Sequence, residues 1–139
     1  MSDANGFNDG IIEEFRANGG KVGGPFEGAP MLLLTVTGAR TGRRYTHPLV
    51  HTRDGDRIVI IASKGGADTH PDWYFNLLAN PTVTVEVGEE TFEAKATPHP
   101  EGPERDRLFE AQANLMPGFW DYEKKTSRVI PVVTLERAD

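Results

Sequence analysis

Short strand-forming segments separated by hairpin turns are the feature of this sequence that most limits its fold. Six segments rich in Val, Ile, Thr and aromatic residues have the length of strands, at residues 31–37, 45–52, 57–63, 82–87, 91–97 and 129–135. Glycine-containing turns at 38–44, 53–56 and 88–90 join neighbouring segments into hairpins. Because short antiparallel strands bury their apolar faces by curling together, we expect a small closed or half-closed barrel of about six mostly antiparallel strands, in an α+β, mainly β fold.

Three or four helices are expected to cover the openings of this barrel. The segments with helical character are residues 7–17, 73–79, 105–116 and 119–125. In the second of them, Trp73, Leu77 and Leu78 are expected to face the core. The last strand segment is nearly all apolar, which indicates that other elements cover both of its faces.

The N-terminal residues 1–28 are expected to form a helix followed by a surface strap. Phe7, Ile11, Ile12 and Phe15 recur at helical spacing, and the opposite side of this helix is acidic. Helices that lie on membranes usually carry Lys or Arg on the polar face, so residues 7–17 should bind a membrane at most weakly. Residues 29–139 are then expected to form a single barrel domain.

Composition excludes several classes of protein. The 139 residues carry a net charge of −6, which argues against general binding to nucleic acid. There is no cysteine, so disulfides, thiolate nucleophiles and cysteine-bound metals are excluded. No apolar run approaches the roughly 18 residues that a membrane span needs, and the N-terminus lacks a signal pattern, so we expect a cytoplasmic protein.

A cationic segment lies within this acidic chain. Between residues 38 and 64 there are two acidic residues, Asp54 and Asp56, and six basic ones, Arg40, Arg43, Arg44, Arg53, Arg57 and Lys64. A local charge of +4 on an acidic background favours a small anionic ligand. The alternative is that the arginines of the 38–44 turn extend into solvent and bind nothing.

The stretch 63–76 connects an apolar strand to a helix and has the composition of a binding loop. We expect Gly65 and Gly66 to present free backbone N–H groups beside a helix N-terminus, a combination that favours anions. Lys64 adds a mobile positive charge. The alternative is an ordinary flexible connection with Lys64 in water.

Several catalytic classes lack their required residues. The four histidines, His47, His51, His70 and His99, form no His-x-x-x-His pair, and a third ligand for His47 and His51 is not evident, so we expect no metal. No Gly-x-Ser-x-Gly, Walker or Gly-x-Gly-x-x-Gly motif is present. What remains is a cationic turn, a Ser-Lys-Gly-Gly loop and an aromatic-rich helix, a set that suits a phosphorylated planar cofactor.

Four motifs resemble those of the deazaflavin (F420)-dependent nitroreductase family of actinobacteria. They are Leu-Thr-Val-Thr-Gly-Ala-Arg-Thr-Gly-Arg-Arg-Tyr-Thr-His-Pro-Leu (34–49), Ala-Ser-Lys-Gly-Gly-Ala (62–67), His-Pro-Asp-Trp-Tyr-Phe-Asn-Leu-Leu-Ala-Asn-Pro (70–81) and Arg-Val-Ile-Pro-Val-Val (128–133). Their order and spacing match over residues 30–136. The resemblance implies a split β-barrel that uses reduced coenzyme F420 as a hydride donor, with the cationic loop holding the coenzyme's phosphate and glutamate tail.

Site residues follow from the resemblance position by position. Arg40 matches a residue that contacts the tail, Pro48 one near the ring, Ala62 to Gly65 the loop around the phosphate and ribityl chain, and Trp73 and Asn76 the wall of the cofactor groove. The full predicted cofactor set is Arg40, Thr41, Arg43, Arg44, Tyr45, Pro48, Ala62, Ser63, Lys64, Gly65, Gly66, Trp73 and Asn76. Tyr45 departs from the family, which commonly has arginine there, so Arg44 or Arg43 is expected to supply the missing charge.

The acceptor side departs further from the nitroreducing members. The residues that match their substrate pocket are Val50, Met116, Phe119 and Tyr122, and only Tyr122 keeps the family's tyrosine. We expect Tyr122 to act in catalysis by donating a hydrogen bond to the acceptor. Such a pocket favours quinones or activated alkenes such as enones over nitro compounds.

Two other functions stay open at this point. One is an FMN-dependent oxidoreductase of the same barrel architecture, related to pyridoxamine-phosphate oxidases. The other is a carrier that binds F420 without catalysis. In each case we expect a small-molecule ligand, no nucleic acid, and a monomer or weak homodimer.

Overall fold

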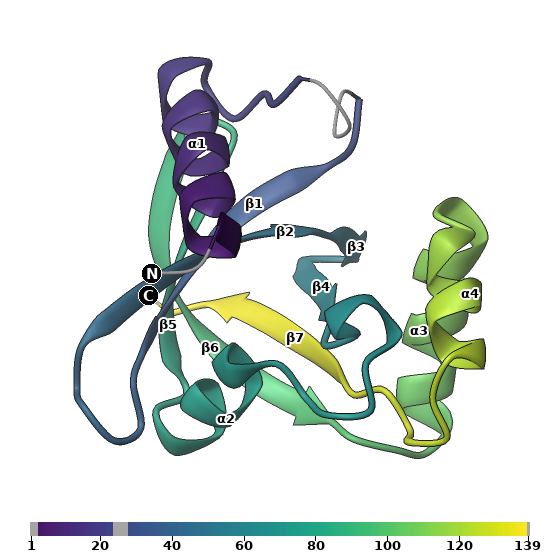
Figure 1. Cartoon of the computed structure of the whole chain (residues 1–139). Helices are drawn as coiled ribbons and strands as arrows, with labels where there is room; N and C mark the ends of the chain where they lie inside the picture. The colour runs from purple at the N-terminus through teal and green to yellow at the C-terminus, as the bar shows by residue number, and fades with distance from the viewer. Residues whose placement is uncertain (1–2, 24–27, 139) are drawn as a thin grey trace.

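The computed structural model describes residues 3–23 and 28–138, in which seven strands form one curled antiparallel sheet (Figure 1). The strands are β1 (Met31–Thr37), β2 (Arg44–Val50), β3 (Thr52–Asp54), β4 (Arg57–Ile61), β5 (Thr82–Val87), β6 (Glu90–His99) and β7 (Val132–Arg137). Their order in the sheet is β2-β1-β5-β6-β7-β4-β3. The predicted antiparallel, half-closed architecture is therefore confirmed.

The extra strand arises because the predicted strand 45–52 is broken at His51. The backbone N–H of His51 donates to the carbonyl of Pro30 at 2.9 Å, outside the strand ladders. Before this residue β2 pairs with β1, and after it β3 pairs with β4. His51 thus carries the chain from one free edge of the sheet to the other, across the opening of the half-barrel.

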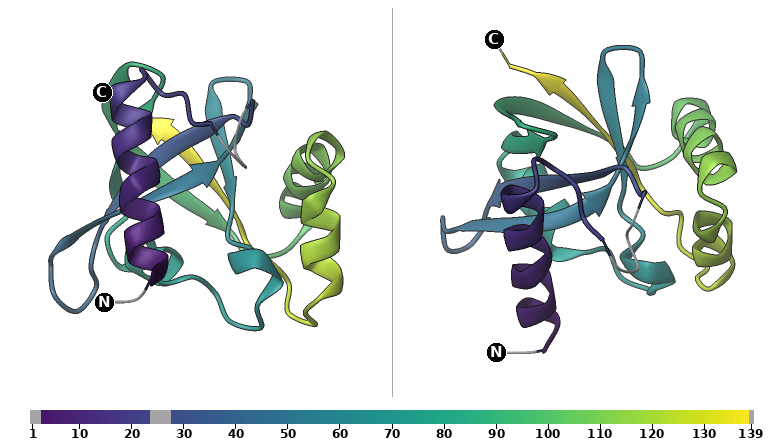
Figure 2. Two further views of the ribbon diagram at one scale, coloured as in Figure 1. Left: turned by 45° about the horizontal axis from the view of Figure 1, so that its top comes forward. Right: turned by 90° about the horizontal axis from the view of Figure 1, so that it is seen from above.

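Helices cover the sheet on several sides. In the described residues they are α1 (Asp3–Ala17), the 3-10 turn η2 (Lys64–Gly66), α2 (Asp72–Ala79), α3 (Pro103–Leu115) and α4 (Gly118–Lys124). Figure 2 shows α1 on one side of the curled sheet and the pair α3 and α4 on the other. No helix in this part of the chain is long and apolar enough to cross a membrane.

Because successive side chains of a strand point to opposite faces of the sheet, the buried residues form separate clusters on its two sides. Leu32, Leu34 and Val36 of β1 point into the curl and join its central cluster, where α2 closes the space with Trp73. Leu33, on the other face of β1, lies under α1. A third cluster fills the space between β4, β7 and the pair α3 and α4.

The N-terminal helix packs on the sheet through the residues predicted to face it. Ile11 and Phe15 are buried against Met31 and Leu33. Arg16 forms a two-bond ion pair with Glu86 of β5. The Phe7 side chain lies outside the described residues.

Two details of the elements differ from the sequence-based expectation. Leu78, which was predicted to face the core, is 46% exposed. Tyr74 is buried in its stead, beside Trp73 and Leu77. The expectation was wrong because residues 73, 74 and 77 form the closer-spaced stripe on the helix. The last strand begins at Val132, since Pro131 has no N–H to donate to a ladder.

Candidate functional site

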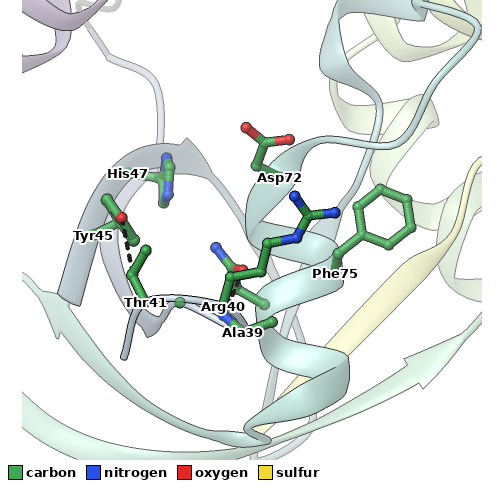
Figure 3. Close-up of a pocket in the computed structure, with 9 residues that line it drawn as sticks. Ala39, Arg40, Thr41, Tyr45, His47, Asp72 and Phe75 are labelled. Carbon is green, nitrogen blue, oxygen red and sulfur yellow. Dashed lines mark hydrogen bonds between the residues drawn. The ribbon is translucent and has the colours of Figure 1, made fainter. Parts of the chain in front are cut away.

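A groove of about 670 Å³ lies between the turn that joins β1 to β2 and the helix α2 (Figure 3). Its lining residues are Gly38, Ala39, Arg40, Thr41, Tyr45, His47, Asp72, Phe75 and Asn76. Four of them, Arg40, Thr41, Tyr45 and Asn76, belong to the predicted cofactor set. The groove therefore brings together residues from two of the sequence motifs.

Hydrogen bonds between the turn and α2 hold the groove in shape. The backbone N–H of Ala39 donates to Oδ1 of Asn76 at 3.0 Å, and Nδ2 of Asn80 donates to the carbonyl of Thr37 at 3.3 Å. Asn76 therefore has a structural contact in addition to its place in the groove wall. A side chain at Gly38 would come within 2.8 Å of Thr41 Oγ1 and the Tyr45 ring, so the turn needs glycine there.

The cationic residues of the turn separate onto two faces. Arg40 and Arg43 are exposed, and Figure 3 shows the Arg40 side chain extending across the groove toward α2. Arg44 lies one residue from Tyr45 on β2 and so points to the opposite face, where its guanidinium donates to Thr37 and Thr84. Tyr45 lines the groove, and its hydroxyl lies 3.1 Å from Thr41 Oγ1.

The η2 loop differs from the predicted anion site. The Gly66 N–H donates to the carbonyl of Ser63 at 3.0 Å, and α2 begins only at Asp72. The expectation of a free Gly66 N–H beside a helix N-terminus was therefore wrong, because the loop closes on itself first. Lys64 and Gly65 are exposed, while Ser63 is buried.

Arg128 holds this loop, and sequence reasoning assigned it no role. Its guanidinium donates to the carbonyls of Ala62, Ser63 and Ala67 and to Nδ1 of His70, at 2.8–3.3 Å. Burial lowers the pKa of His70, and so does the charge of Arg128, which keeps the imidazole neutral and able to accept this bond. The 128–133 motif was the available signal, but only the fold shows where its arginine points.

The predicted acceptor residues gather around one cluster. Phe119 is buried in the cluster between β4, β7, α3 and α4, and Val50, Met116 and Tyr122 pack against it. The Tyr122 ring meets the Phe119 ring edge-on at 5.5 Å. Helix α4, which carries Tyr122, also packs on the η2 loop, where a Cβ at Gly66 would lie 2.9 Å from the Tyr122 carbonyl. Of the predicted acceptor residues, Tyr122 therefore lies on a helix that contacts the predicted phosphate loop.

Nine of the thirteen predicted cofactor residues do not line the groove, namely Arg43, Arg44, Pro48, Ala62, Ser63, Lys64, Gly65, Gly66 and Trp73. Trp73 is buried in the central core, Ala62 is buried where its N–H donates to Pro131, and Pro48 lies on the face of β2 opposite Tyr45. Their proposed contacts with a cofactor stay predictions.

His47 is the groove residue that sequence reasoning considered only as a metal ligand. Its Nε2 atom is fully buried and has no hydrogen-bond partner among the described residues. Burial lowers the pKa of His47, and the opposing effect of Asp72 is smaller. Within residues 3–23 and 28–138, no cluster of three or more His, Asp or Glu side chains could hold a metal.

The comparison with known proteins decides the family. The family model described as F420H(2)-dependent quinone reductase matches residues 11–137. The chain belongs to this family. The F420H(2)-dependent quinone reductase Rv1261c of Mycobacterium tuberculosis (strain ATCC 25618 / H37Rv) is 43% identical over 126 residues, which cover 88% of this chain and 85% of that protein. The predicted membership among F420-dependent reductases is confirmed.

Solved structures agree with this assignment. One described as an F420-H2 dependent reductase, FDR-A, is 38% identical, with a TM-score of 0.70 over 77% of this chain and 94% of its own. Another, described as a domain-swapped dimer, is 34% identical, with a TM-score of 0.72 over 96% of this chain and 98% of its own. A candidate pyridoxamine 5'-phosphate oxidase from Listeria innocua is 12% identical, with a TM-score of 0.58 over 79% of this chain and 85% of its own. The last likeness concerns the fold alone, and it confirms the split barrel.

The residues of the groove and of the β1–β2 turn beside it fit the coenzyme that the family uses. Coenzyme F420 combines a planar ring with an anionic phosphate and tail. Arg40 and Arg43 form no ion pair with another described residue, so both charges are available to an anion.

Proposed function

We propose that this protein binds reduced F420 in the groove between the β1–β2 turn and α2 and uses it to reduce a quinone. Reduction of quinones with F420H(2) is the activity for which its family is named. The observation that carries the placement is the convergence of Arg40, Thr41, Tyr45 and Asn76 on one groove. The reduced coenzyme supplies the hydride when it is bound.

The cationic side chains bind the charged part of the coenzyme. Arg40 and Arg43 suit the anionic tail, because a guanidinium pairs with carboxylates and phosphates through two parallel hydrogen bonds. Lys64 on the η2 loop suits the phosphate as a mobile point charge. Arg128 holds this loop in its shape by donating to the carbonyls of Ala62 and Ser63.

The acceptor lies against the apolar cluster that holds Phe119. Val50 and Met116 provide flat apolar contact, and the Tyr122 hydroxyl is the polar group there. A donor aimed at the quinone oxygen stabilises the negative charge that develops on it during reduction. Enones are further acceptors that meet the same requirement, and nitro compounds fit this apolar cluster less well.

The decisive experiment combines cofactor identification with turnover. The purified protein is mixed anaerobically with F420H(2) and a water-soluble naphthoquinone, and coenzyme oxidation is followed by absorbance. We expect quinone-dependent oxidation above the rate without protein. Binding without oxidation would indicate a carrier, and a yellow protein that retains FMN would indicate the flavin alternative.

Tyr122→Phe tests the acceptor side. We expect unchanged affinity for the coenzyme and a turnover number lower by about ten-fold, equivalent to about 1.4 kcal/mol of transition-state stabilisation. Tyr74→Phe, which removes a hydroxyl in the central core, is the matched control and should leave turnover unchanged. Equal turnover of wild type and Tyr122→Phe, with hydride transfer rate-limiting, would reduce Tyr122 to a packing residue.

We place the protein in the cytoplasm, with at most weak attachment to a membrane surface through residues 7–17. The burial of Ile11 and Phe15 against β1 supports this limit, because it leaves little of the helix for lipid. We further propose a monomer or weak homodimer. Light scattering over a range of protein concentrations tests this, and a stable dimer at low concentration would contradict it.

A further inference from the structure

His47 occupies a part of the groove for which no ligand group has been assigned. It lies two residues after Tyr45 on β2, so both side chains face the groove. Its ring is half-buried, and the Nε2 atom is the nitrogen that is shielded from solvent. The remaining nitrogen, Nδ1, is therefore the one available to a molecule in the groove.

The missing partner of Nε2 decides which nitrogen carries the proton. A neutral imidazole has one N–H group and one lone pair. An unpaired N–H in a buried position is rarer in proteins than an unpaired acceptor, so the proton belongs on Nδ1. His47 thus presents a neutral hydrogen-bond donor to the groove.

Asp72 lines the same groove from α2, across from β2 (Figure 3). It is close enough to influence His47 electrostatically. Its carboxylate accepts hydrogen bonds and repels anions, so this part of the groove does not suit a phosphate or a carboxylate tail. A hydroxyl group, which both donates and accepts, matches a donor on one wall and an acceptor on the other.

We propose that Nδ1–H of His47 and the carboxylate of Asp72 bind the hydroxyl groups of the coenzyme's sugar-alcohol chain. This inference rests on the proposed function, and it assigns the uncharged middle of the coenzyme to the two walls of the groove. Arg40 and Lys64 then bind the charged groups at other points of the site.

The tautomer can be tested without any coenzyme. In protein labelled with ¹⁵N in histidine, at pH 8, we expect the Nδ1 resonance of His47 at the protonated position and Nε2 at the unprotonated one. Addition of oxidised F420 should shift the Nδ1 resonance. A proton on Nε2 would overturn the inference, because Nδ1 could then not donate.

Binding of coenzyme fragments tests which part of the ligand is contacted. The probes are F420, a fragment with the ring and sugar-alcohol chain but no phosphate, and the ring with a methyl group in place of the chain. We expect His47→Leu to weaken the first two by about ten-fold and the third not at all. His47→Asn, which keeps an N–H close to the place of Nδ1, should restore most of the affinity. His99→Leu, on β6 outside the groove, is the control and should change none of the three.

Asp72→Ala separates hydrogen bonding from general electrostatics. Removal of an acidic group near an anionic ligand should tighten binding if only charge matters, whereas loss of a hydroxyl acceptor should weaken binding by several-fold. We expect weaker binding for Asp72→Ala, and no weakening for Asp68→Ala, an exposed acidic residue in the preceding loop.

The outcomes distinguish this inference from the proposed function. Wild-type protein that binds no F420 would overturn both. Wild-type binding with an unchanged His47→Leu variant, or an equal loss with the ring alone, would overturn only the assignment of His47. Each variant is checked by thermal unfolding, and if His47→Leu does not fold, His47→Asn and the ¹⁵N shifts decide.

Discussion

At the residue scale, the exposed basic residues Arg40 and Lys64 give the clearest test of coenzyme binding. We expect Arg40→Ala and Lys64→Ala each to weaken binding of F420 by about 1–3 kcal/mol, because each loses a charge-assisted contact. Neither side chain is buried, so the stability of the fold should change little. Fluorescence titration gives the dissociation constants, and thermal unfolding gives the stability.

The salt dependence of wild-type binding checks the same assignment. Attraction between exposed charges is screened over about 8–10 Å at 0.1–0.15 M salt, so the dissociation constant should rise with salt. Lys95 is an exposed basic residue on β6, so Lys95→Ala is the matched control for Arg40→Ala and Lys64→Ala and should keep wild-type affinity. A dissociation constant that stays the same as the salt concentration rises would contradict the role of the cationic turn.

At the element scale, the contact between α4 and the η2 loop depends on Gly66. This residue has φ +88°, and a Cβ there would lie 2.9 Å from the Tyr122 carbonyl and 3.0 Å from Lys125 Cβ. We expect Gly66→Ala to reduce the free energy of unfolding by about 1–3 kcal/mol, the range for a strained backbone conformation, and to move α4 away from the loop. Urea unfolding measures the first effect.

Gly65→Ala is the matched control for this substitution. Gly65 also has positive φ, at +65°, but no atom lies within 4 Å of a Cβ built there. Gly65→Ala should also lower the free energy of unfolding through its strained backbone conformation, but it should not displace α4. Turnover with a quinone should therefore fall more in Gly66→Ala than in Gly65→Ala. Equal effects of the two substitutions on turnover would show that the position of α4 does not matter for the reaction.

At the scale of the whole molecule, an ion-pair network joins the β3–β4 hairpin to α3. It should make the stability of the fold depend on pH in the acidic range. Asp54 is paired with both Arg57 and Arg107, and Arg107 also binds Glu104. Hydrogen bonds from Arg107 and then from Arg57 hold the pKa of Asp54 well below its ordinary value. Since the folded-state pKa is lowered, this stabilisation is present above the unfolded pKa, about 3.9, and is lost as pH falls below it.

We therefore expect Asp54→Asn to lower the melting temperature at pH 7 and to lose this difference from wild type as pH falls from about 4 toward the folded-state pKa. Asp56→Asn, in the same hairpin but without an ion pair to the described residues, should match wild type throughout. A difference for Asp54→Asn that persists unchanged at pH 2 would show that the ion pairs are not its source.

Local patterns in the sequence were sufficient for most of the strands, for the hairpins and for most of the helices. Alternation and turn residues act between neighbours in the chain, so the β1–β2 hairpin and the β5–β6 hairpin could be predicted before any contact between distant residues was known. The cationic turn is also local, because Arg40 and Arg43 lie in one connection. The family resemblance added the cofactor and most of the site residues.

Only the tertiary structure decided how these parts meet. The break at His51 follows from its bond to Pro30 and from the pairing of β2 and β3 with different strands, which no local pattern encodes. The Arg44 guanidinium donates to Thr84 of β5 on the face of β2 opposite the groove, and Arg128 donates to carbonyls that lie 65 and 66 residues earlier in the chain. Burial of one nitrogen of His47 likewise depends on the packing around β2 and cannot be derived from the spacing of histidines. The sequence by itself determined the elements and their charges, whereas contacts between distant segments, which depend on closure of the barrel, decided the direction in which each polar side chain points.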